Sequence, residues 1–248
     1  MLAILGGTGL TNLANLTITH RQVIRTPYGE PSGALLFGNI AGHEVMFMAR
    51  HGYGHTIPPH LVNYRANLWA LSSQKATHVI SVSAVGSIDS NLAPGTLVIP
   101  DQLIDYTSNR EHTYFDTPDH RVTHMDFTEP FSHVLRAICT AAAKKSSIDV
   151  KLGGVYAVTQ GPRLDTAAEV KRYQGDGASM VGMTGMPEAA LARELGLEYL
   201  TLAVVSNYAA GCAGNLHRIE GQEVYATLER AMYLVRGFLE QVVICFHD

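Results

Sequence analysis

A glycine-rich turn near the start of the chain has the composition of an anion-binding loop. The residues Gly6-Gly7-Thr8-Gly9-Leu10 follow a short apolar run. Their glycines would let backbone N–H groups approach an anion, and the hydroxyl of Thr8 could donate one more hydrogen bond. A turn without any function is the alternative. A dinucleotide-binding fingerprint fails, because Asn12 occupies the position where G-x-G-x-x-G needs its third glycine.

A second loop places a guanidinium and an imidazole directly after another apolar run. Arg50 and His51 belong to the segment Ala49–His55, and a bidentate arginine contact suits an oxyanion. Taken alone, however, the loop is better explained by a structural salt bridge from Arg50 and by packing of His51. A metal site is disfavoured further, because glycines and prolines between the histidines prevent the single helix face that zinc-binding pairs use. The histidines concerned are His51, His55 and His60.

Two further loops carry polar side chains after apolar runs. The segment Ser83-Ala84-Val85-Gly86-Ser87 has the small residues of a turn that a ligand can approach, but it lacks the G-x-S-x-G of a serine nucleophile. The segment Thr159–Thr166 turns after a predicted strand and opens a helix, with Asp165 at its start. On spacing alone, capping of that helix by Asp165 is preferred to a role in binding.

These loops need strands to position them, and the apolar pattern predicts both strands and helices. Short runs rich in β-branched residues predict buried strands at 2–5, 44–49, 78–82, 96–99, 154–159, 180–182 and 199–205. Apolar residues at i, i+3 and i+4 predict helices at 63–73, 130–144, 166–175, 187–195 and 223–243. Their alternation predicts an α/β fold with a mixed, largely parallel β-sheet flanked by helices on both faces. Ligands are expected at the carboxyl ends of the strands.

Length and composition predict one domain that handles small molecules. The 248 residues suit a single domain, 1–248, without repeats or a proline- and serine-rich linker. Residues 106–130 have little apolar periodicity and are predicted to form a long functional loop. A formal charge of −4 gives no footprint for nucleic acid or for an anionic membrane surface. Three scattered cysteines, and no run of about eighteen apolar residues, predict a soluble cytoplasmic protein.

Six short motifs, taken together and in order, resemble those of the trimeric purine nucleoside phosphorylase and methylthioadenosine phosphorylase family. They are G-G-T-G-L from residue 6, A-R-H-G from 49, N-Y-R-A-N from 63, G-P-R-L-D-T from 161, G-M-T-G-M-P-E from 182 and S-N-Y from 206. The resemblance covers nearly the whole chain, and the last two motifs are fairly specific to the family. It implies a purine nucleoside phosphorylase-like fold, a homotrimer with sites near subunit interfaces, and no metal or organic cofactor.

By this resemblance the chain would catalyse reversible phosphorolysis of the N-glycosidic bond of a purine nucleoside, with inorganic phosphate as co-substrate. Phosphate would attack C1′ as that carbon gains oxocarbenium character, while the purine leaves with developing negative charge. No covalent enzyme intermediate is needed, so catalysis would rest on positioning and electrostatic preorganisation. The expected phosphate ligands are Thr8, Arg50, His51 and Thr184, with Ser83 and Ala84 near phosphate and ribose.

The base site is expected to recognise a 6-oxopurine. Methylthioadenosine enzymes carry aspartates where this chain has Asn207 and Ala209. The amide of Asn207 can donate to a 6-oxo group and accept from a protonated N7, and the carboxylate of Asp165 can accept from N1–H. We therefore expect Asn207 and Asp165 to be the catalytic, base-reading residues. The remaining substrate contacts are expected from Met183 under the sugar and from Leu164, Tyr208 and Ala209.

The 5′ end of the nucleoside is expected to meet an apolar pocket. Alignment with the family places Gly221 where 6-oxopurine nucleoside phosphorylases carry a histidine for the 5′-hydroxyl, and Ile219 lies nearby. The two ends together predict 5′-methylthioinosine as substrate, with hypoxanthine and 5-methylthioribose 1-phosphate as products. The alternatives are a methylthioadenosine phosphorylase, a general 6-oxopurine nucleoside phosphorylase, and a non-catalytic module that binds nucleoside or phosphate.

Overall fold

The computed structural model describes residues 1–116, 123–213 and 219–248. Its strands are β1 Leu2–Gly6, β2 Thr17–Gln22, β3 Leu35–Ile40, β4 His43–Ala49, β5 His78–Ser87, β6 Leu97–Ile99, β7 Gln102–Asp105, β8 Val150–Leu152, β9 Val155–Val158, β10 Met180–Gly182 and β11 Glu198–Tyr208. Its helices are α1 Tyr64–Ser73, α2 His133–Ser146, α3 Ala167–Gly175, α4 Gly185–Glu194 and α5 Gly221–His247, with a short 3₁₀ helix at Pro59–Leu61.

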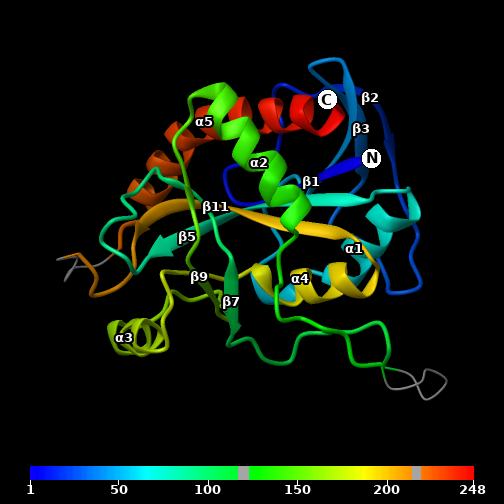
Figure 1. Ribbon diagram of the computed structural model, residues 1–248. Helices are drawn as coiled ribbons and strands as arrows, with labels where there is room; N and C mark the ends of the chain where they lie inside the picture. Colours follow the sequence, from blue (N-terminus) through cyan, green and yellow to red (C-terminus); the bar gives the residue numbers. More distant parts are fainter. Residues whose placement is uncertain (117–122, 214–218) are drawn as a thin grey trace.

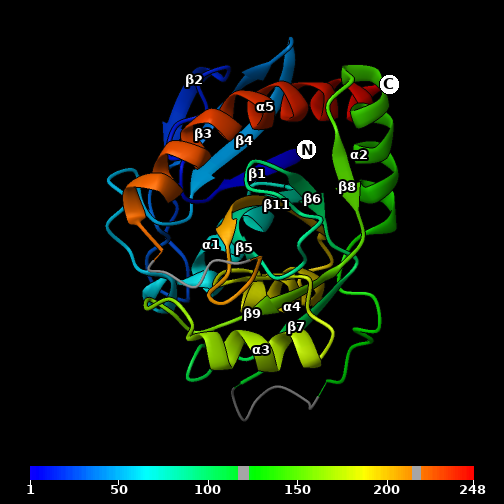
Figure 2. The ribbon, with the colours of Figure 1, turned by 90° about the vertical axis from the view of Figure 1, so that its left-hand side faces the viewer.

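The described strands form one mixed sheet between layers of helices. The strand order is β2-β3-β4-β1-β5-β10-β9-β7, while β11 pairs with β5 and β6, and β6 also pairs with β8. Helices α2 and α5 pack together over one face, and α1 and α4 pack together on the other (Figure 1). In the view of Figure 2, α5 lies above the strands and α3 lies below them. The expected mixed α/β architecture is therefore confirmed.

The five predicted helices are confirmed, and their first turns show why they start where they do. Asn63 accepts a hydrogen bond from the N–H of Ala66 before α1, and Ser132 accepts one from Leu135 before α2. These side chains satisfy backbone donors that a helix leaves unpaired at its start. Helix α2 consequently begins at His133, three residues later than the apolar pattern alone suggested.

Several strands differ from the expectation. The segment Ser83–Ser87, expected as a turn, continues β5, and β11 likewise extends to Tyr208. The two strands support each other, because they are paired in parallel from His78 and Glu198 to Ser87 and Tyr208. Four strands were not predicted: β2, β3, β7 and β8. In β2 every residue is exposed, so its sequence carries no apolar signal, and pairing with β3 holds it in place.

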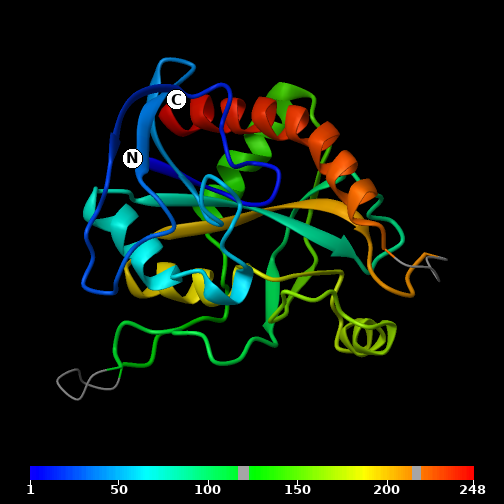
Figure 3. The ribbon, with the colours of Figure 1, turned by 180° about the vertical axis from the view of Figure 1, so that it is seen from behind.

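The sheet opens along one edge of β5. Strand β11 occupies the other edge over nearly its full length, so β1 and β10 must share this one. Strand β1 pairs only as far as Ser81, and β10 pairs only with Gly86 and Ser87. Residues 82–85 thus face a gap between β1 and β10. Strands β5 and β11 both run toward the end of the molecule that holds α3 and the first turns of α5 (Figure 3).

The chain carries its three cysteines as free thiols: Cys139, Cys212 and Cys245. Within the described ranges, no helix combines the length and apolar character needed to cross a membrane.

Candidate active site

A cavity of about 600 Å³ lies at the gap in the sheet. Its walls come from the start of α5 and from the carboxyl ends of five strands, β1, β4, β5, β10 and β11. The predicted site residues that line it are Thr8, Arg50, His51, Ser83, Ala84, Leu164, Asp165, Met183, Thr184, Asn207, Ala209, Ile219 and Gly221. Residues from seven separate segments of the chain are therefore brought together, whereas the N-Y-R-A-N motif from residue 63 contributes none of them.

Tyr208 is the exception among the predicted site residues, because it does not line the cavity. Among the described residues, the cavity lining includes Asn207 and Ala209 but omits Tyr208. The ring of Tyr208 packs beside a small buried cluster that contains Tyr173 and Val170. Successive side chains of a strand point to opposite faces, and Tyr208 follows the cavity-lining Asn207 as the last residue of β11.

The glycine turn after β1 needs its glycines for steric reasons. A Cβ atom on Gly7 would lie 2.4 Å from the carbonyl oxygen of Val82 and 2.9 Å from Nη1 of Arg50. Gly9 has φ +84°, in the left-handed region that favours glycine. The N–H of Leu10 closes the turn on the carbonyl of Gly7 at 3.0 Å. The backbone therefore passes directly over the gap and presents Thr8 to the cavity.

Arg50 forms a buried ion pair with Glu188, and both side chains are fully buried. Its Nε and Nη2 donate to the two carboxylate oxygens at 2.6 and 3.0 Å, and Nη1 donates to the carbonyl of Val82 at 3.1 Å. Burial alone would lower the pKa of Arg50, but the charge and hydrogen bond of Glu188 outweigh it, so the pKa lies above its ordinary value. The structural salt bridge weighed from the sequence is thus present, while Nη1 still borders the cavity beside Gly7.

Glu188 was not assigned a role from the sequence, although it is the charge that balances Arg50. The hydroxyls of Ser81 and Tyr199 also donate to its Oε1, at 2.6 and 2.8 Å. The available signal was a carboxylate in the first turn of α4, a helix whose neighbouring residues are mostly small and apolar. Because the guanidinium charge is neutralised on site, an anion in this cavity would depend strongly on N–H and hydroxyl donors.

His51 is held by a backbone carbonyl. Its Nδ1 lies 2.8 Å from the carbonyl oxygen of Ile57, and its side chain is almost completely buried at the cavity wall. Burial, reinforced by the charge of Arg50, lowers the pKa of His51 to about 4. The ring of His55 lies 5.0 Å away, centroid to centroid. The described residues contain no group of three His, Cys, Asp or Glu side chains arranged to hold a metal ion.

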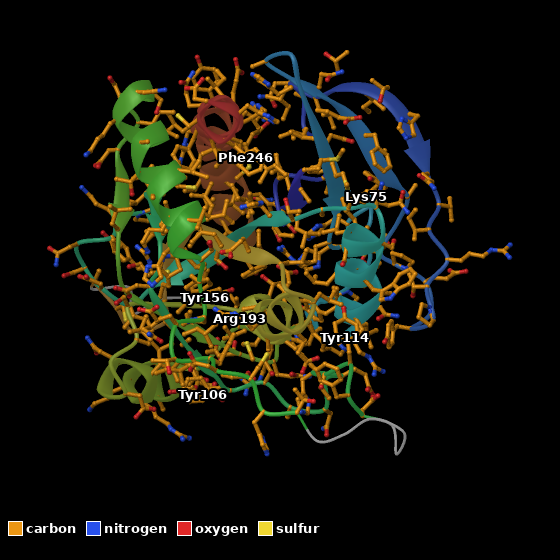
Figure 4. All side chains as sticks on the ribbon, turned by 45° about the vertical axis from the view of Figure 1, so that its right-hand side comes forward. Lys75, Tyr106, Tyr114, Tyr156, Arg193 and Phe246 are labelled. Atoms are coloured by element: carbon orange, nitrogen blue, oxygen red, sulfur yellow. The ribbon has the colours of Figure 1, made fainter. Side chains whose placement is uncertain are left out.

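Two hydroxyls meet across the gap. The Oγ of Ser83 lies 3.0 Å from Oγ1 of Thr184. This pairing follows from the antiparallel register, because β10 continues past Gly182 toward the open part of β5. Thr184 is the N-cap residue of α4, but its side chain makes no capping bond. Its N–H lies 3.4 Å from the hydroxyl of Tyr156, whose ring is fully buried in the interior (Figure 4).

Asn207 is oriented by its neighbours at the opposite end of the cavity. Its Oδ1 accepts from the hydroxyl of Ser206 at 2.6 Å, and its Nδ2 donates to the carbonyl of Tyr208 at 2.8 Å. An amide has two acceptor lone pairs and two N–H donors. Counting bonds to the described part of the chain, one of each remains for a ligand, which is the set that a 6-oxopurine with a protonated N7 would use.

Asp165 faces the same end of the cavity and does not cap α3. The N-cap residue is Thr166, which forms a capping box with Glu169, so the capping interpretation of Asp165 is wrong. Its two carboxylate oxygens accept from Thr159 Oγ1 at 3.2 Å and from the hydroxyl of Tyr173 at 3.1 Å. Burial raises the pKa of Asp165, against the opposing effect of these two hydrogen bonds.

Arg110 was missed by sequence reasoning and ties the site loops together. It lies in the predicted long loop, which over its described residues has neither helix nor strand between β7 and α2. Its guanidinium donates to the carbonyls of Met183, Met186 and Gln160 at 2.8, 2.6 and 2.8 Å. Within the described residues its partners are uncharged. The sequence offered a weak signal, namely an arginine in a stretch without apolar periodicity.

The same loop is anchored next to α3. Tyr106 donates to Asp176 at 2.7 Å, and its ring lies 4.7 Å from that of Tyr173. Figure 4 shows Tyr106 beside α3, away from the centre of the sheet. Because Tyr173 also binds Asp165, the long loop supports the base end of the cavity indirectly.

The remaining wall comes from the start of α5 and is largely apolar. Ile219, Val224 and Leu228 line it, with Ile57 from the loop after β4. Among the described residues, Gly221 leaves open space, since none of their heavy atoms lies within 4 Å of a Cβ built at that residue. The site is therefore asymmetric, with hydroxyls and a glycine turn at one end, an amide and a carboxylate at another, and aliphatic side chains on the remaining wall.

The loops around this cavity lie at the carboxyl edge of a largely parallel sheet and carry hydrogen-bonding groups. This arrangement defines an α/β enzyme for a small polar substrate.

Residues 1–243 match the Phosphorylase superfamily, and the chain belongs to that family. A protein from Xanthomonas campestris named probable S-methyl-5′-thioinosine phosphorylase is 49% identical over 93% of this chain and 92% of its own length. A probable 6-oxopurine nucleoside phosphorylase from Dictyoglomus turgidum is 47% identical over 98% of this chain and 90% of its own length.

The fold agrees with a solved structure of methylthioadenosine phosphorylase from Schistosoma mansoni in complex with adenine. The TM-score is 0.94 at 32% identity, covering 99% of this chain and 91% of the other. The expected purine nucleoside phosphorylase-like fold is therefore confirmed, and the chain is an enzyme of the purine nucleoside phosphorylase type.

Proposed function

We propose that this enzyme catalyses the reversible phosphorolysis of S-methyl-5′-thioinosine to hypoxanthine and 5-methylthioribose 1-phosphate. The observation that carries the proposal is that Asn207 and Asp165 line one cavity together with Thr8, Ser83 and Thr184. Asn207 lies beside Gly86 of β5, and the contact of Ser83 with Thr184 lies three residues earlier on the same strand. A purine and a phosphate would then lie on either side of one sugar. The names of the relatives from Xanthomonas and Dictyoglomus support a 6-oxopurine substrate.

In the proposed reaction an oxygen of phosphate forms a bond to C1′ as the bond from C1′ to N9 breaks. The electron pair of the broken bond passes to the purine. As the base leaves, N7 would take a proton from solvent water, so that the product is neutral hypoxanthine. Asn207 would donate to O6 and accept from N7–H, and Asp165 would accept from N1–H. Such hydrogen bonds strengthen as charge develops on the base, so they favour the transition state over the bound substrate. The proposal requires no metal or organic cofactor.

Discrimination between bases would come from donors and acceptors. Asp165 finds an N1–H in hypoxanthine, whereas adenine has a bare N1, and the free N–H of Asn207 meets an acceptor at position 6 only in the oxopurine. A buried polar mismatch costs about 1–3 kcal/mol, so two of them correspond to roughly a hundredfold preference or more.

Selectivity at the 5′ end would come from the aliphatic wall. Ile219, Val224 and Leu228 offer no hydrogen-bond partner for a 5′-hydroxyl, and the space at Gly221 admits a methylthio group. A general 6-oxopurine nucleoside phosphorylase remains the alternative if this wall tolerates the hydroxyl. A methylthioadenosine phosphorylase is the alternative if the base site tolerates adenine.

The proposal includes a homotrimer in a reducing cytoplasm. Leu164 and Tyr225 line the cavity and yet are 55% and 59% exposed, so covering by a second copy would complete the site. The three free thiols suit a reducing compartment. Sedimentation equilibrium tests the assembly, and a monomer at micromolar concentration would contradict it.

The decisive experiment compares phosphate-dependent cleavage of methylthioinosine, methylthioadenosine and inosine at equal concentrations, with release of hypoxanthine or adenine measured. Preference for methylthioinosine is expected. Preference for methylthioadenosine would overturn the base assignment, and preference for inosine would overturn the 5′ pocket. Absence of cleavage of all three would overturn the proposed activity.

A further inference from the structure

Two neighbouring strands separate beside the cavity. The ladder between β9 and β10 ends where the N–H of Thr159 donates to the carbonyl of Gly182 at 2.8 Å. Residues 160–165 then lead away from β9, whereas residues 183–186 lead from β10 into α4. These segments are the base-side branch and the sugar-side branch, after the part of the nucleoside that each would contact in the proposed reaction.

The guanidinium of Arg110 bridges the two branches beyond the end of this ladder. Its Nη2 donates to the carbonyl of Gln160 at 2.8 Å, and Nε donates to the side-chain oxygen of the same residue at 3.1 Å. Its Nη1 donates to the carbonyls of Met183 and Met186 at 2.8 and 2.6 Å. The five N–H donors of a guanidinium point in fixed directions, so one side chain can hold two diverging segments, whereas the three donors of an ammonium share one atom.

The two branches also pack closely against each other. Gly161 has φ +62°, and a Cβ atom at that residue would lie 2.5 Å from Sδ of Met183. Met183 is part of the cavity wall. A small shift of the base-side branch would therefore move the wall on which the sugar would lie.

Each branch has hydrogen bonds that do not involve Arg110. Asp165 accepts from Thr159 and Tyr173, and the hydroxyl of Thr184 lies 3.0 Å from that of Ser83. These contacts would persist without the guanidinium. The contribution of Arg110 is thus the spacing between the branches.

Arg110 is itself held by the N-Y-R-A-N motif, whose five residues are all described and do not line the cavity. The ring of Tyr64 lies 5.4 Å from the guanidinium carbon of Arg110, and its hydroxyl accepts from Nη1 at 3.3 Å. Arg65 pairs with Glu111 and Asp116 at 2.8 and 2.5 Å, and both carboxylates belong to the loop that carries Arg110. The motif therefore fixes the segment from which Arg110 reaches the branches.

We propose that Arg110 is a positioning residue for the phosphorolysis, which sets the spacing between the base-side and sugar-side branches, and that the N-Y-R-A-N motif acts on the reaction through it. Breaking of the bond between C1′ and N9 requires the base and the sugar to stay aligned while they separate. A misplacement of about 1 Å can cost about a hundredfold in rate. The proposal rests on the proposed function for the part of the nucleoside at each branch.

Arg110→Lys tests the proposal, because it keeps the charge and the aliphatic stem but removes the fork of donors. The kcat for methylthioinosine should fall roughly tenfold to a hundredfold. The dissociation constants of hypoxanthine alone and of phosphate alone, measured by calorimetry, should stay close to those of the parent, since each branch keeps its own contacts. A purely structural role would weaken both ligands together with kcat. That result would overturn the proposal, and so would an unchanged kcat.

Chemical rescue gives a second measurement. Added guanidinium ion should occupy the space left in Arg110→Ala and restore part of kcat in a saturable manner, whereas ammonium at the same concentration should not. Absence of rescue in a folded Arg110→Ala protein would contradict the proposal. If Arg110→Ala does not fold, Arg110→Lys decides the outcome.

Arg136→Ala is the matched control. The guanidinium of Arg136 also donates to two backbone carbonyls, those of Ile99 and Pro100, and none of these residues lines the described cavity. This variant should keep the parent kcat and show no response to guanidinium. An equal loss of kcat in Arg136→Ala would show that Arg110 has no special role.

Failure of the proposed function and failure of this proposal give different results. The first is seen in the parent, which would then cleave none of the three nucleosides or prefer one other than methylthioinosine; in the latter case the kcat comparison is made with the preferred nucleoside. The second is seen only in the variants. Cleavage of methylthioinosine by Arg110→Lys at the parent rate would support the proposed function and refute the role of Arg110.

Discussion

The two ends of the cavity are built from different parts of the fold. At the anion end, Arg50, Ser83 and Thr184 come from buried strands or their immediate ends, and the strongest charges are already paired inside the protein. At the base end, Leu164 and Asp165 come from a loop and are partly exposed. Substitution of Arg50, Ser83 or Thr184 should therefore disturb the sheet, whereas substitution of Leu164 or Asp165 should leave it largely unchanged.

Glu188→Gln should produce the largest effect, because it leaves the charge of Arg50 buried without a counter-ion. Loss of one partner of a buried pair costs about 3–5 kcal/mol, so the melting temperature should fall by on the order of 10 °C. Phosphate should raise the melting temperature of the variant more than that of the parent, since the anion then compensates the guanidinium.

Thermal denaturation with and without phosphate measures both effects of Glu188→Gln. Asp149→Asn is the matched control, since it breaks an exposed ion pair with Lys151 at 2.9 Å and should cost less than about 1 kcal/mol. A Glu188→Gln variant as stable as the control would show that the anion end is not held by this ion pair.

Asn207→Asp should change the base end without affecting the anion end. The carboxylate would accept from a 6-amino group and repel a 6-oxo group. The ratio of kcat/KM for methylthioinosine over methylthioadenosine should fall roughly tenfold to a hundredfold. The KM for phosphate serves as the internal control and should stay the same. An unchanged substrate ratio would refute the role of Asn207.

Ser206→Ala should have a smaller effect on the same end. The Oγ of Ser206 lies 2.6 Å from Oδ1 of Asn207 and 3.1 Å from the carbonyl oxygen of Val85. Its single hydroxyl proton therefore favours Asn207. Loss of this hydrogen bond frees the amide to rotate and costs about 0.5–1.5 kcal/mol. We expect a twofold to tenfold decrease in kcat/KM for nucleoside, an unchanged KM for phosphate, and recovery in Ser206→Thr. A decrease for both substrates would indicate general destabilisation.

Protonation of Asp165 should give the mildest effect, seen only in acid. Burial raises its pKa, and only the ionised carboxylate accepts from N1–H. As pH falls through this raised pKa, kcat/KM for methylthioinosine should decrease at a pH above the ordinary aspartate range. Activity with methylthioadenosine, which lacks N1–H, should lack this limb, as should the Asp165→Asn variant. Identical acid limbs for the two substrates would contradict the assignment.

The sequence predicted those features whose cause is local. Helices with an apolar face have a periodic pattern, and buried parallel strands have short apolar runs, so the five helices and the central strands were predicted. Strand β2 is held by pairing with β3 and is exposed throughout, so its sequence contains no signal. The partner of Arg50 lies 138 positions away, and Arg110 reaches carbonyls about 50 and 75 positions away. Such pairings are properties of the folded chain.

The open edge of β5 leaves part of its hydrogen-bond ladder, at residues 82–85, without a partner strand. The carbonyl of Val82 accepts from the side chain of Arg50, where a neighbouring strand would ordinarily supply a backbone donor. A phosphate and a sugar in the gap would occupy the place of that missing strand. The substrate would then also be a structural element, and we expect local opening of the sheet to be most frequent at these four residues of β5.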